Sequence, residues 1–187
     1  CYQNACVAAE GFSNVYVVDS RNLSTGHGLV VLEAALAAQR GEQPEAIVAH
    51  LNEVAGRVEA SFVVDKLDYL VKGGRCSSAA ALGANLLKLK PCIEVVDGRM
   101  KVGKKYRGNY DKVLLQYVRE RLDGRDDLAL DRIFVTHTPC RPETVEAVKA
   151  EIQTCAPFSE IIETTAGCTI SSHCGPNTLG ILFLRSR

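Results

Sequence analysis

The chain has 187 residues, of which 47% are hydrophobic and 24% are charged, and its formal net charge is zero. These values are typical of a soluble globular protein with one large domain or two small ones. Scattered, balanced charge argues against a nucleic-acid partner, and no apolar run is long enough for a membrane span or a signal peptide.

Eight cysteines are spread along the chain without any Cys-x-x-Cys pair. Most lie in apolar stretches, where a free cysteine packs as a small hydrophobic residue. Because a chain of this size has enough core to fold without disulfides, we predict free thiols and a cytoplasmic location. His137, Cys140 and residues 168–174 could contribute zinc ligands, but they lack the paired spacing of structural zinc sites, so we expect no metal or cofactor.

Strand and helix patterns alternate in the first part of the chain. Ser24 can cap one helix and Gly41 can end it, while Pro44 suits the first turn of the next. In chain order we predict a helix over residues 1–9, a strand over 15–18, helices over 24–40 and from 44 through 58, a strand over 61–65, and a helix over 67–72. This alternation favours a parallel sheet covered by helices.

A β-hairpin interrupts the pattern in the second part. Asp97-Gly98 is a strong signal for its turn, and Pro142 suits the start of a later helix. We predict helices over residues 79–87, 110–118 and 142–152, and strands over 92–96, 100–106, 132–136, 160–165 and 179–184. The sequence therefore predicts an α/β fold in two domains. Residues 1–73 would form an incomplete α/β domain with a parallel sheet, and residues 74–187 a second α/β domain with a mixed sheet.

Two loops carry side chains suited to an anionic ligand. In residues 66–78 an apolar helix ends at Gly73-Gly74, Arg75 follows, and Ser77 can cap the next helix. An arginine beside a helix N-terminus suits a carboxylate or a phosphate. Residues 171–177 place His173 among small polar groups, and histidine can donate to an anion. An ordinary helix connection and a histidine bonded within a turn are the structural alternatives.

These loops resemble sequence motifs of a known family. Residues 67–77 resemble the leucine-(aromatic)-leucine-glycine-glycine-arginine signature of the DegV family of bacterial fatty-acid-binding proteins. Similar segments follow in the family's order at residues 86–91, 105–108 and 173–180, and residues 17–20 with 24–26 resemble the family's aspartate-serine turn and following helix. The resemblance covers essentially the whole chain.

The resemblance implies a fold, a ligand and a partner. Members are two-domain α/β proteins that hold one long-chain fatty acid, such as palmitate, in a buried tunnel between the domains. They present its carboxylate to a separate fatty acid kinase and perform no chemistry themselves. By this resemblance Arg75 and His173 would lie near the carboxylate, Ser77 would shape the same loop, and Gly175 with Pro176 would fix the backbone of the histidine.

The chain departs from the family pattern at three places. The family carries a serine-glycine-threonine-tyrosine segment whose serine binds the carboxylate, and Cys1 stands at the position of the threonine. We therefore expect this chain to lack the family's N-terminal segment. Cys76 replaces a usual isoleucine, and Asn177 replaces a common glycine. Asparagine tolerates the left-handed conformation that a glycine would adopt there.

Two alternatives stay open. The first is a small-molecule hydrolase or transferase that uses Cys1, as an N-terminal nucleophile, or His173. Against it, residues 1–9 have a helical pattern, whereas such nucleophiles start a strand. The second concerns five basic residues on the hairpin, which either protect a solvated edge strand or form a docking surface for an acidic partner such as the kinase. They are Arg99, Lys101, Lys104, Lys105 and Arg107.

Overall fold

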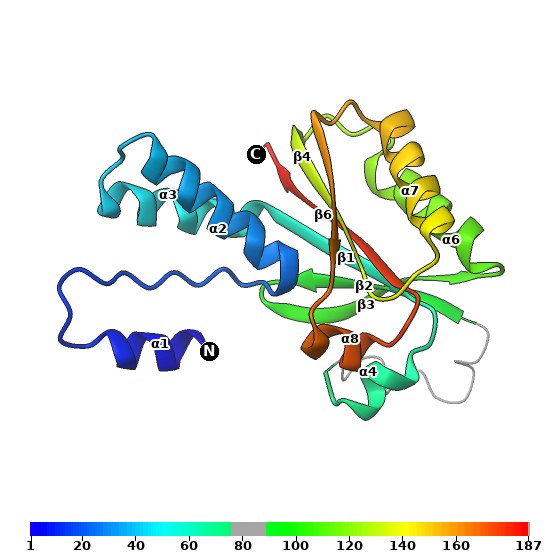
Figure 1. The fold of residues 1–187 in the computed structure, drawn as a ribbon, viewed down its shortest axis with the longest axis horizontal. Helices are drawn as coiled ribbons and strands as arrows, with labels where there is room; N and C mark the ends of the chain where they lie inside the picture. Colours follow the sequence, from blue (N-terminus) through cyan, green and yellow to red (C-terminus); the bar gives the residue numbers. More distant parts are fainter. Residues whose placement is uncertain (76–88, 187) are drawn as a thin grey trace.

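A computed structural model of the chain describes residues 1–75 and 89–186, and Figure 1 shows their arrangement. Within these residues the strands form one mixed sheet of six strands in the order β3-β2-β1-β6-β4-β5. The strands are β1 (Val58–Val64), β2 (Leu89–Val96), β3 (Arg99–Arg107), β4 (Leu128–His137), β5 (Glu160–Thr165) and β6 (Thr178–Arg185). β4 and β5 run parallel, and each of the other neighbouring pairs is antiparallel.

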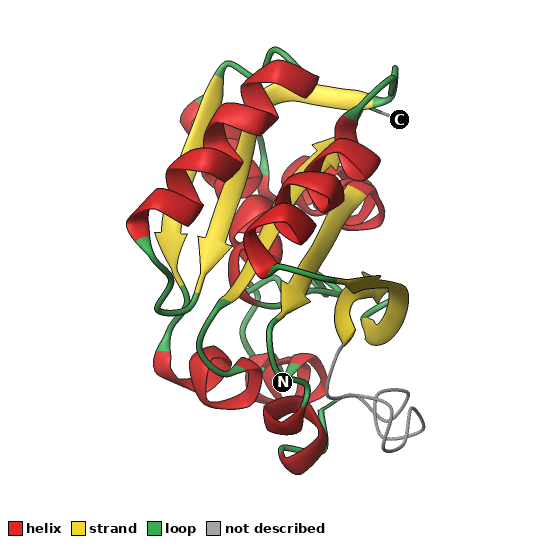
Figure 2. Cartoon of the chain, turned by 90° about the vertical axis from the view of Figure 1, so that its right-hand side faces the viewer, coloured by secondary structure: helices red, strands yellow, loops and turns green. Residues whose placement is uncertain are grey.

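Helices cover both faces of the sheet. Figure 2 views the molecule from the side on which two helices lie in front of the strands. These are α6 (Tyr110–Leu122) and α7 (Pro142–Cys155), while α2 (Ser24–Gln39) and α3 (Pro44–Arg57) pack on the opposite face. Two short helices, α4 (Asp68–Lys72) and α8 (Cys168–Cys174), lie side by side below α2 in Figure 1. Helix α1 (Tyr2–Ala9) buries none of its residues.

Alternation along the central strands divides the core between the two faces. In β6, Ile181 and Phe183 pack against α6 and α7, whereas Leu182 joins the cluster of α2 and α3. Successive side chains of a strand point to opposite faces, so β6 serves both layers at once. Its near-continuous run of apolar residues follows from this position, because a strand covered on both sides has no solvent face.

Several predictions from the sequence are confirmed. The α/β class and the mixed sheet are present, and α2, α3, α4, α6 and α7 lie close to their predicted positions. Pro44 occupies the first turn of α3. At the hairpin turn Asp97 and Gly98 have φ angles of 52° and 72°, as the tight turn between β2 and β3 requires. The predicted helix over residues 79–87 lies outside the described residues.

Other details of the prediction are corrected. Residues 15–18 are extended but join no strand within the described part of the chain, and Val15 is 47% exposed. β1 runs antiparallel to both of its neighbours, so it belongs to the mixed sheet rather than to a parallel sheet. Strand-helix alternation does not determine the direction in which the next strand returns. The loop predicted over residues 171–177 is helical in its first part, since residues 171–174 belong to α8. The division after Gly73 stays a prediction.

The basic hairpin strand β3 lies at the edge of the sheet. Its five basic side chains are exposed, as expected for residues that discourage pairing with another strand. Lys104 forms an ion pair with Glu120 of α6. A docking role for this strand stays a prediction, and its test should reverse Lys101 and Lys105 rather than Lys104, whose charge stabilises the contact with α6.

Tyr117 of α6 is buried and forms hydrogen bonds to the sheet, and its replacement should lower the free energy of unfolding. The Tyr117 hydroxyl donates to the Ser61 carbonyl oxygen (2.8 Å), lies 2.8 Å from the Ser61 hydroxyl and accepts from the Ile181 N–H (3.2 Å). Tyr117→Phe removes these three buried interactions, so we expect a loss of about 1–3 kcal/mol in the free energy of unfolding, measured by urea denaturation. Tyr16→Phe, at an exposed site, should change it by less than about 0.5 kcal/mol. Equal effects of the two variants would contradict this assignment.

Candidate functional site

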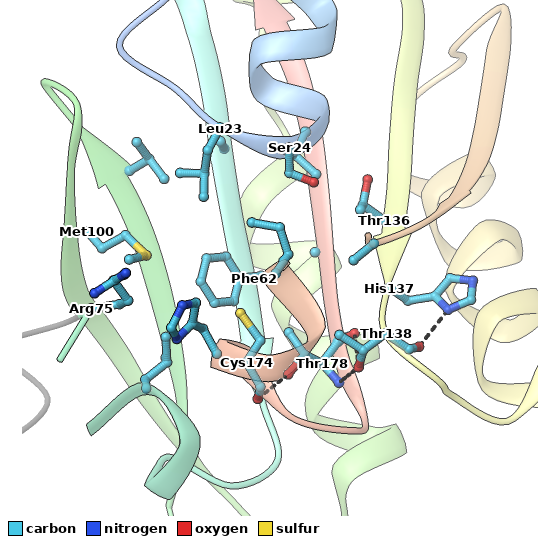
Figure 3. A pocket seen from close by; sticks show the side chains of 18 of the residues that line it. Leu23, Ser24, Phe62, Arg75, Met100, Thr136, His137, Thr138, Cys174 and Thr178 are labelled. Carbon is cyan, nitrogen blue, oxygen red and sulfur yellow. Dashed lines mark hydrogen bonds between the residues drawn. The ribbon is translucent and has the colours of Figure 1, made fainter. Parts of the chain in front are cut away.

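An apolar cavity of about 180 Å³ lies between the sheet and the helices α2, α4 and α8. Figure 3 shows Leu23 and Ser24 at one end, Cys174 and Thr178 at the opposite end, and Phe62 between them. The lining residues are Leu23, Ser24, Ala60, Phe62, Leu70, Arg75, Val95, Met100, Thr136, His137, Thr138, Ala166, Thr169, Ile170, His173, Cys174, Thr178, Gly180 and Leu182. Burial raises the pKa of the Cys174 thiol to about 11, so this side chain is neutral at physiological pH.

Close packing of α4 against α8 brings the two predicted loops together. A Cβ at Gly73 would lie 2.5 Å from His173 Nδ1, and a Cβ at Gly175 would lie 2.4 Å from Cδ2 of Tyr69. Contacts this short leave no space for a side chain at either position. The two glycines therefore let the helix ends touch, and this contact brings Arg75 and His173, which are far apart in sequence, to the wall of one cavity.

Arg75 and His173 have unused hydrogen-bonding capacity. Arg75 is exposed, and its Nη1 donates to the Gly73 carbonyl oxygen at 3.2 Å. That is its sole side-chain hydrogen bond within residues 1–75 and 89–186, and the half-buried His173 ring has none to those residues. In Figure 3 Arg75 lies beside Met100, on the side of the cavity opposite His137. Both side chains are thus able to donate to a ligand.

Threonine hydroxyls near α8, in contrast, are used by the protein itself. Thr138 Oγ1 donates to the Gly175 carbonyl oxygen at 2.8 Å, and Thr178 Oγ1 donates to the Cys174 carbonyl oxygen at 3.0 Å. The Thr178 N–H in turn donates to Thr138 Oγ1 at 3.0 Å. These bonds attach the segment after α8 to the end of β4. They also satisfy the hydroxyls, so these threonines contribute little polarity to the cavity.

On the β4 side of the cavity, too, polar side chains are hydrogen-bonded within the protein. The Thr136 hydroxyl is hydrogen-bonded to the hydroxyl of Thr25 in α2. The buried His137 ring bonds through Nδ1 to the following carbonyl oxygen (2.8 Å) and through Nε2 to Glu163 (3.2 Å). Hydrogen bonds from Lys149 and from His137 lower the pKa of the Glu163 carboxyl. Thr136, His137, Thr138 and Thr178 therefore add little polarity to the cavity, because their polar atoms are already paired.

The backbone after α8 adopts conformations that few residues tolerate. Gly175 is buried with φ of 75° and ψ of 175°, a combination that only glycine adopts readily. Asn177 has φ of 54°, which confirms the left-handed conformation predicted for it. Its N–H donates to the Pro139 carbonyl oxygen at 3.1 Å. This segment holds the C-terminal end of α8, and with it His173, in place.

The structure brings together most of the predicted site residues. Arg75, His173 and Gly175 lie at the contact of α4 with α8, while Ser77 lies outside the described residues. Cys1 is an exposed residue before α1 and does not line the cavity. Their roles toward a ligand stay predictions.

Four residues of the cavity wall were not predicted from the sequence. They are Thr136, Thr138 and Thr178, together with His137, which was considered only as a zinc ligand. Threonine is common in strands, so the sequence contains no signal that distinguishes these residues from other strand residues. Across the described ranges no cluster of three or more histidine, cysteine, aspartate or glutamate side chains could bind a metal ion. None of the described helices combines the length and the apolar character needed to cross a membrane.

The chain is similar to known proteins in sequence and in fold. The family model described as "Uncharacterised protein, DegV family" matches residues 1–186. A DegV domain-containing protein of Caldanaerobacter subterraneus is 31% identical over 185 residues, which are 97% of this chain and 65% of that protein. The chain thus spans just under two thirds of the length of this curated relative.

Solved structures give the same result. A DegV family protein from Thermus thermophilus, described for its fatty acid binding, matches with a TM-score of 0.82 and 30% identity over 98% of this chain and 66% of its own. A DegV lipid-binding protein from Thermotoga maritima matches with a TM-score of 0.82 and 27% identity over 98% of this chain and 64% of its own. The family model, the sequence relative and both structures point to one assignment, and the chain belongs to the DegV family.

Proposed function

We propose that the protein binds one long-chain fatty acid, such as palmitate, and holds its acyl chain in the apolar cavity. The carboxylate would be bound by Arg75 and His173, in a loop that Ser77 helps to shape. One observation carries the proposal: Arg75 and His173 have no side-chain hydrogen bond to the described residues of the cavity wall, whereas the polar atoms of Thr136, His137, Thr138 and Thr178 in the same wall are already paired. An arginine suits a carboxylate because its planar guanidinium stays charged and can bind both oxygens.

Burial of the acyl chain would supply most of the affinity. Each buried methylene contributes about 0.8 kcal/mol, so a chain of about sixteen carbons offers roughly 10 kcal/mol before the cost of ordering the ligand. The carboxylate would be costly to bury without a partner, which assigns Arg75 and His173 a role in specificity as well as in affinity. The fatty-acid-binding proteins among the relatives support this assignment.

We further propose that the protein is a cytoplasmic carrier without catalytic activity, and that it presents the carboxylate to a fatty acid kinase. The resemblance to the family supports this partner. The alternative, a hydrolase or transferase, gains no support from Cys1, which is exposed and absent from the cavity wall.

Palmitate and its methyl ester distinguish recognition of the carboxylate from simple burial of the chain. The ester buries the same methylenes but lacks the negative charge. Because a hydrogen bond to a charged group contributes about 1.5–3 kcal/mol, we expect the acid to bind at least about 10-fold more tightly in isothermal titration. Equal affinities would refute carboxylate recognition, and failure of both ligands to bind would refute the proposed function.

A further inference from the structure

Asp65 lies at the point where the chain leaves β1 for α4. The strands β1 and β6 pair as far as Val64 and Thr178, so the register brings Asp65 opposite Asn177, the residue before β6. On the other side of β1, Lys90 of β2 reaches the same position. Asp65 is therefore flanked by residues of both neighbouring segments.

The carboxylate of Asp65 contacts both of these residues. Lys90 Nζ donates to Asp65 Oδ1 at 2.5 Å and to the Asp65 carbonyl oxygen at 3.0 Å. The Asn177 amide nitrogen Nδ2 lies 3.5 Å from Asp65 Oδ2. The side chains of Asp65 and Lys90 are 19% and 18% exposed, so salt screens their ion pair less than it screens a surface pair. Because Lys90 binds the carbonyl oxygen as well as the carboxylate, it fixes both the backbone and the side chain at this turn.

Each segment that meets at Asp65 leads to one of the proposed ligand-binding residues. α4 begins three residues after Asp65 and is followed by Arg75, whereas α8, which contains His173, ends three residues before Asn177. The two helices also pack against each other. A change in the direction of either segment would therefore move Arg75 relative to His173. Neither Asp65 nor Lys90 lines the apolar cavity, so an effect on the ligand would pass through these segments.

We propose that Asp65 is a positioning residue for the fatty-acid carboxylate. It joins the turn before α4 to the segment after α8, and so determines the spacing of Arg75 and His173. This inference rests on the proposed function and adds to the same site a residue that does not touch the ligand. Charge alone would act in the opposite direction, since a negative carboxylate at Asp65 repels that of the fatty acid. Removal of the Asp65 charge should thus weaken binding of the acid through positioning, and would strengthen it through charge alone.

Palmitate and its methyl ester test this proposal in wild-type protein, Asp65→Asn and Lys90→Gln. The measured quantity is the Kd of the ester divided by the Kd of the acid in the same variant, from isothermal titration. Residues coupled through a backbone shift commonly change each other's energies by a factor of two or more, so we expect this ratio to fall about threefold or more in both variants. The two substitutions change the net charge in opposite directions, so charge alone cannot lower the ratio in both. A loss of stability raises both Kd values together and cancels, and Lys90→Gln keeps the test informative if Asp65→Asn does not fold.

Asp68→Asn is the matched control, because Asp68 is an exposed residue in the first turn of α4 and does not line the cavity. Its ratio should equal that of the wild type. A ratio that rises in Asp65→Asn and falls in Lys90→Gln would assign the effect to charge and overturn this inference. An unchanged ratio in both variants would assign the ion pair to the fold alone, and would also overturn the inference while the proposed function stands. A wild-type ratio near one, or wild-type protein that binds neither ligand, would overturn both.

Discussion

Arg75→Ala is expected to weaken fatty-acid binding by about 10- to 150-fold while the free energy of unfolding stays nearly unchanged. The lost affinity corresponds to a hydrogen bond with a charged group, about 1.5–3 kcal/mol. Stability should hardly change, because Arg75 is exposed and its side chain donates within the described residues only to the nearby Gly73 carbonyl oxygen. His173→Ala should act in the same direction, since its ring has no hydrogen bond within that part of the chain.

Isothermal titration with palmitate, beside thermal melts of the same samples, separates the two effects. Arg107→Ala is a suitable control because this exposed arginine lies at the end of β3 and does not line the cavity. We expect its affinity for palmitate to equal that of the wild type. Lower stability of Arg75→Ala with unchanged affinity would show that the arginine serves the fold rather than the ligand.

Gly175→Ala should be the most destabilising of the substitutions considered. With φ of 75° and ψ of 175°, Gly175 occupies a region that costs other residues about 1–3 kcal/mol. A Cβ would also lie 2.4 Å from the ring of Tyr69 and force α4 away from α8. We expect a total loss of about 2–4 kcal/mol in the free energy of unfolding, together with weaker binding of palmitate, because His173 would move with α8.

Two further variants separate the contribution of the backbone from that of the contact. Gly124 also has a positive φ, of 69°, but a Cβ there meets nothing within 4 Å. Gly124→Ala should therefore cost only about 1–2 kcal/mol in urea denaturation. Adding Tyr69→Ala to Gly175→Ala should recover part of the lost stability. If Gly175→Ala costs no more than Gly124→Ala, the contact between Tyr69 and Gly175 does not limit this position.

Most local backbone signals in the sequence were reliable, although Ser24 does not cap α2, whose N-cap residue is Leu23. Asp97-Gly98 predicted the hairpin, Pro44 and Pro142 mark the first turns of α3 and α7, and Asn177 adopts the left-handed conformation. Each of these features depends on the residue's own φ preference or on its missing N–H. Such preferences act within a few residues and do not depend on the rest of the fold.

Features that depend on distant contacts were not predictable in the same way. Residues 15–18 have β propensity, but propensity forms no strand without a neighbour that accepts its hydrogen bonds. Helix α8 contains Ser171, Ser172 and His173, which are weak helix formers, and Cys174 buries it against Leu70 of α4. The antiparallel direction of β1 likewise follows from its partners β2 and β6.

The residues of the candidate site also fall into a group that local sequence predicts and a group that it does not. Arg75 and His173 were predicted because each lies close to glycines, Gly73-Gly74 and Gly175. Glycines beside a polar residue indicate a backbone conformation that other residues rarely adopt. The threonines of β4 and β6 had no such neighbours, and only their hydrogen bonds in the folded chain distinguish them. That Ala60 and Val95 lie side by side in the wall of the apolar cavity follows from the register of β1 and β2, which no local pattern reports.

A crystal structure of the protein with bound palmitate tests the central claim most directly. We predict a carboxylate oxygen about 2.7–3.2 Å from the Arg75 guanidinium or the His173 ring, and an acyl chain that passes Phe62 toward the Leu23 end of the cavity. A carboxylate at the Leu23 end of the cavity, or an acyl chain bound elsewhere on the protein, would contradict the account.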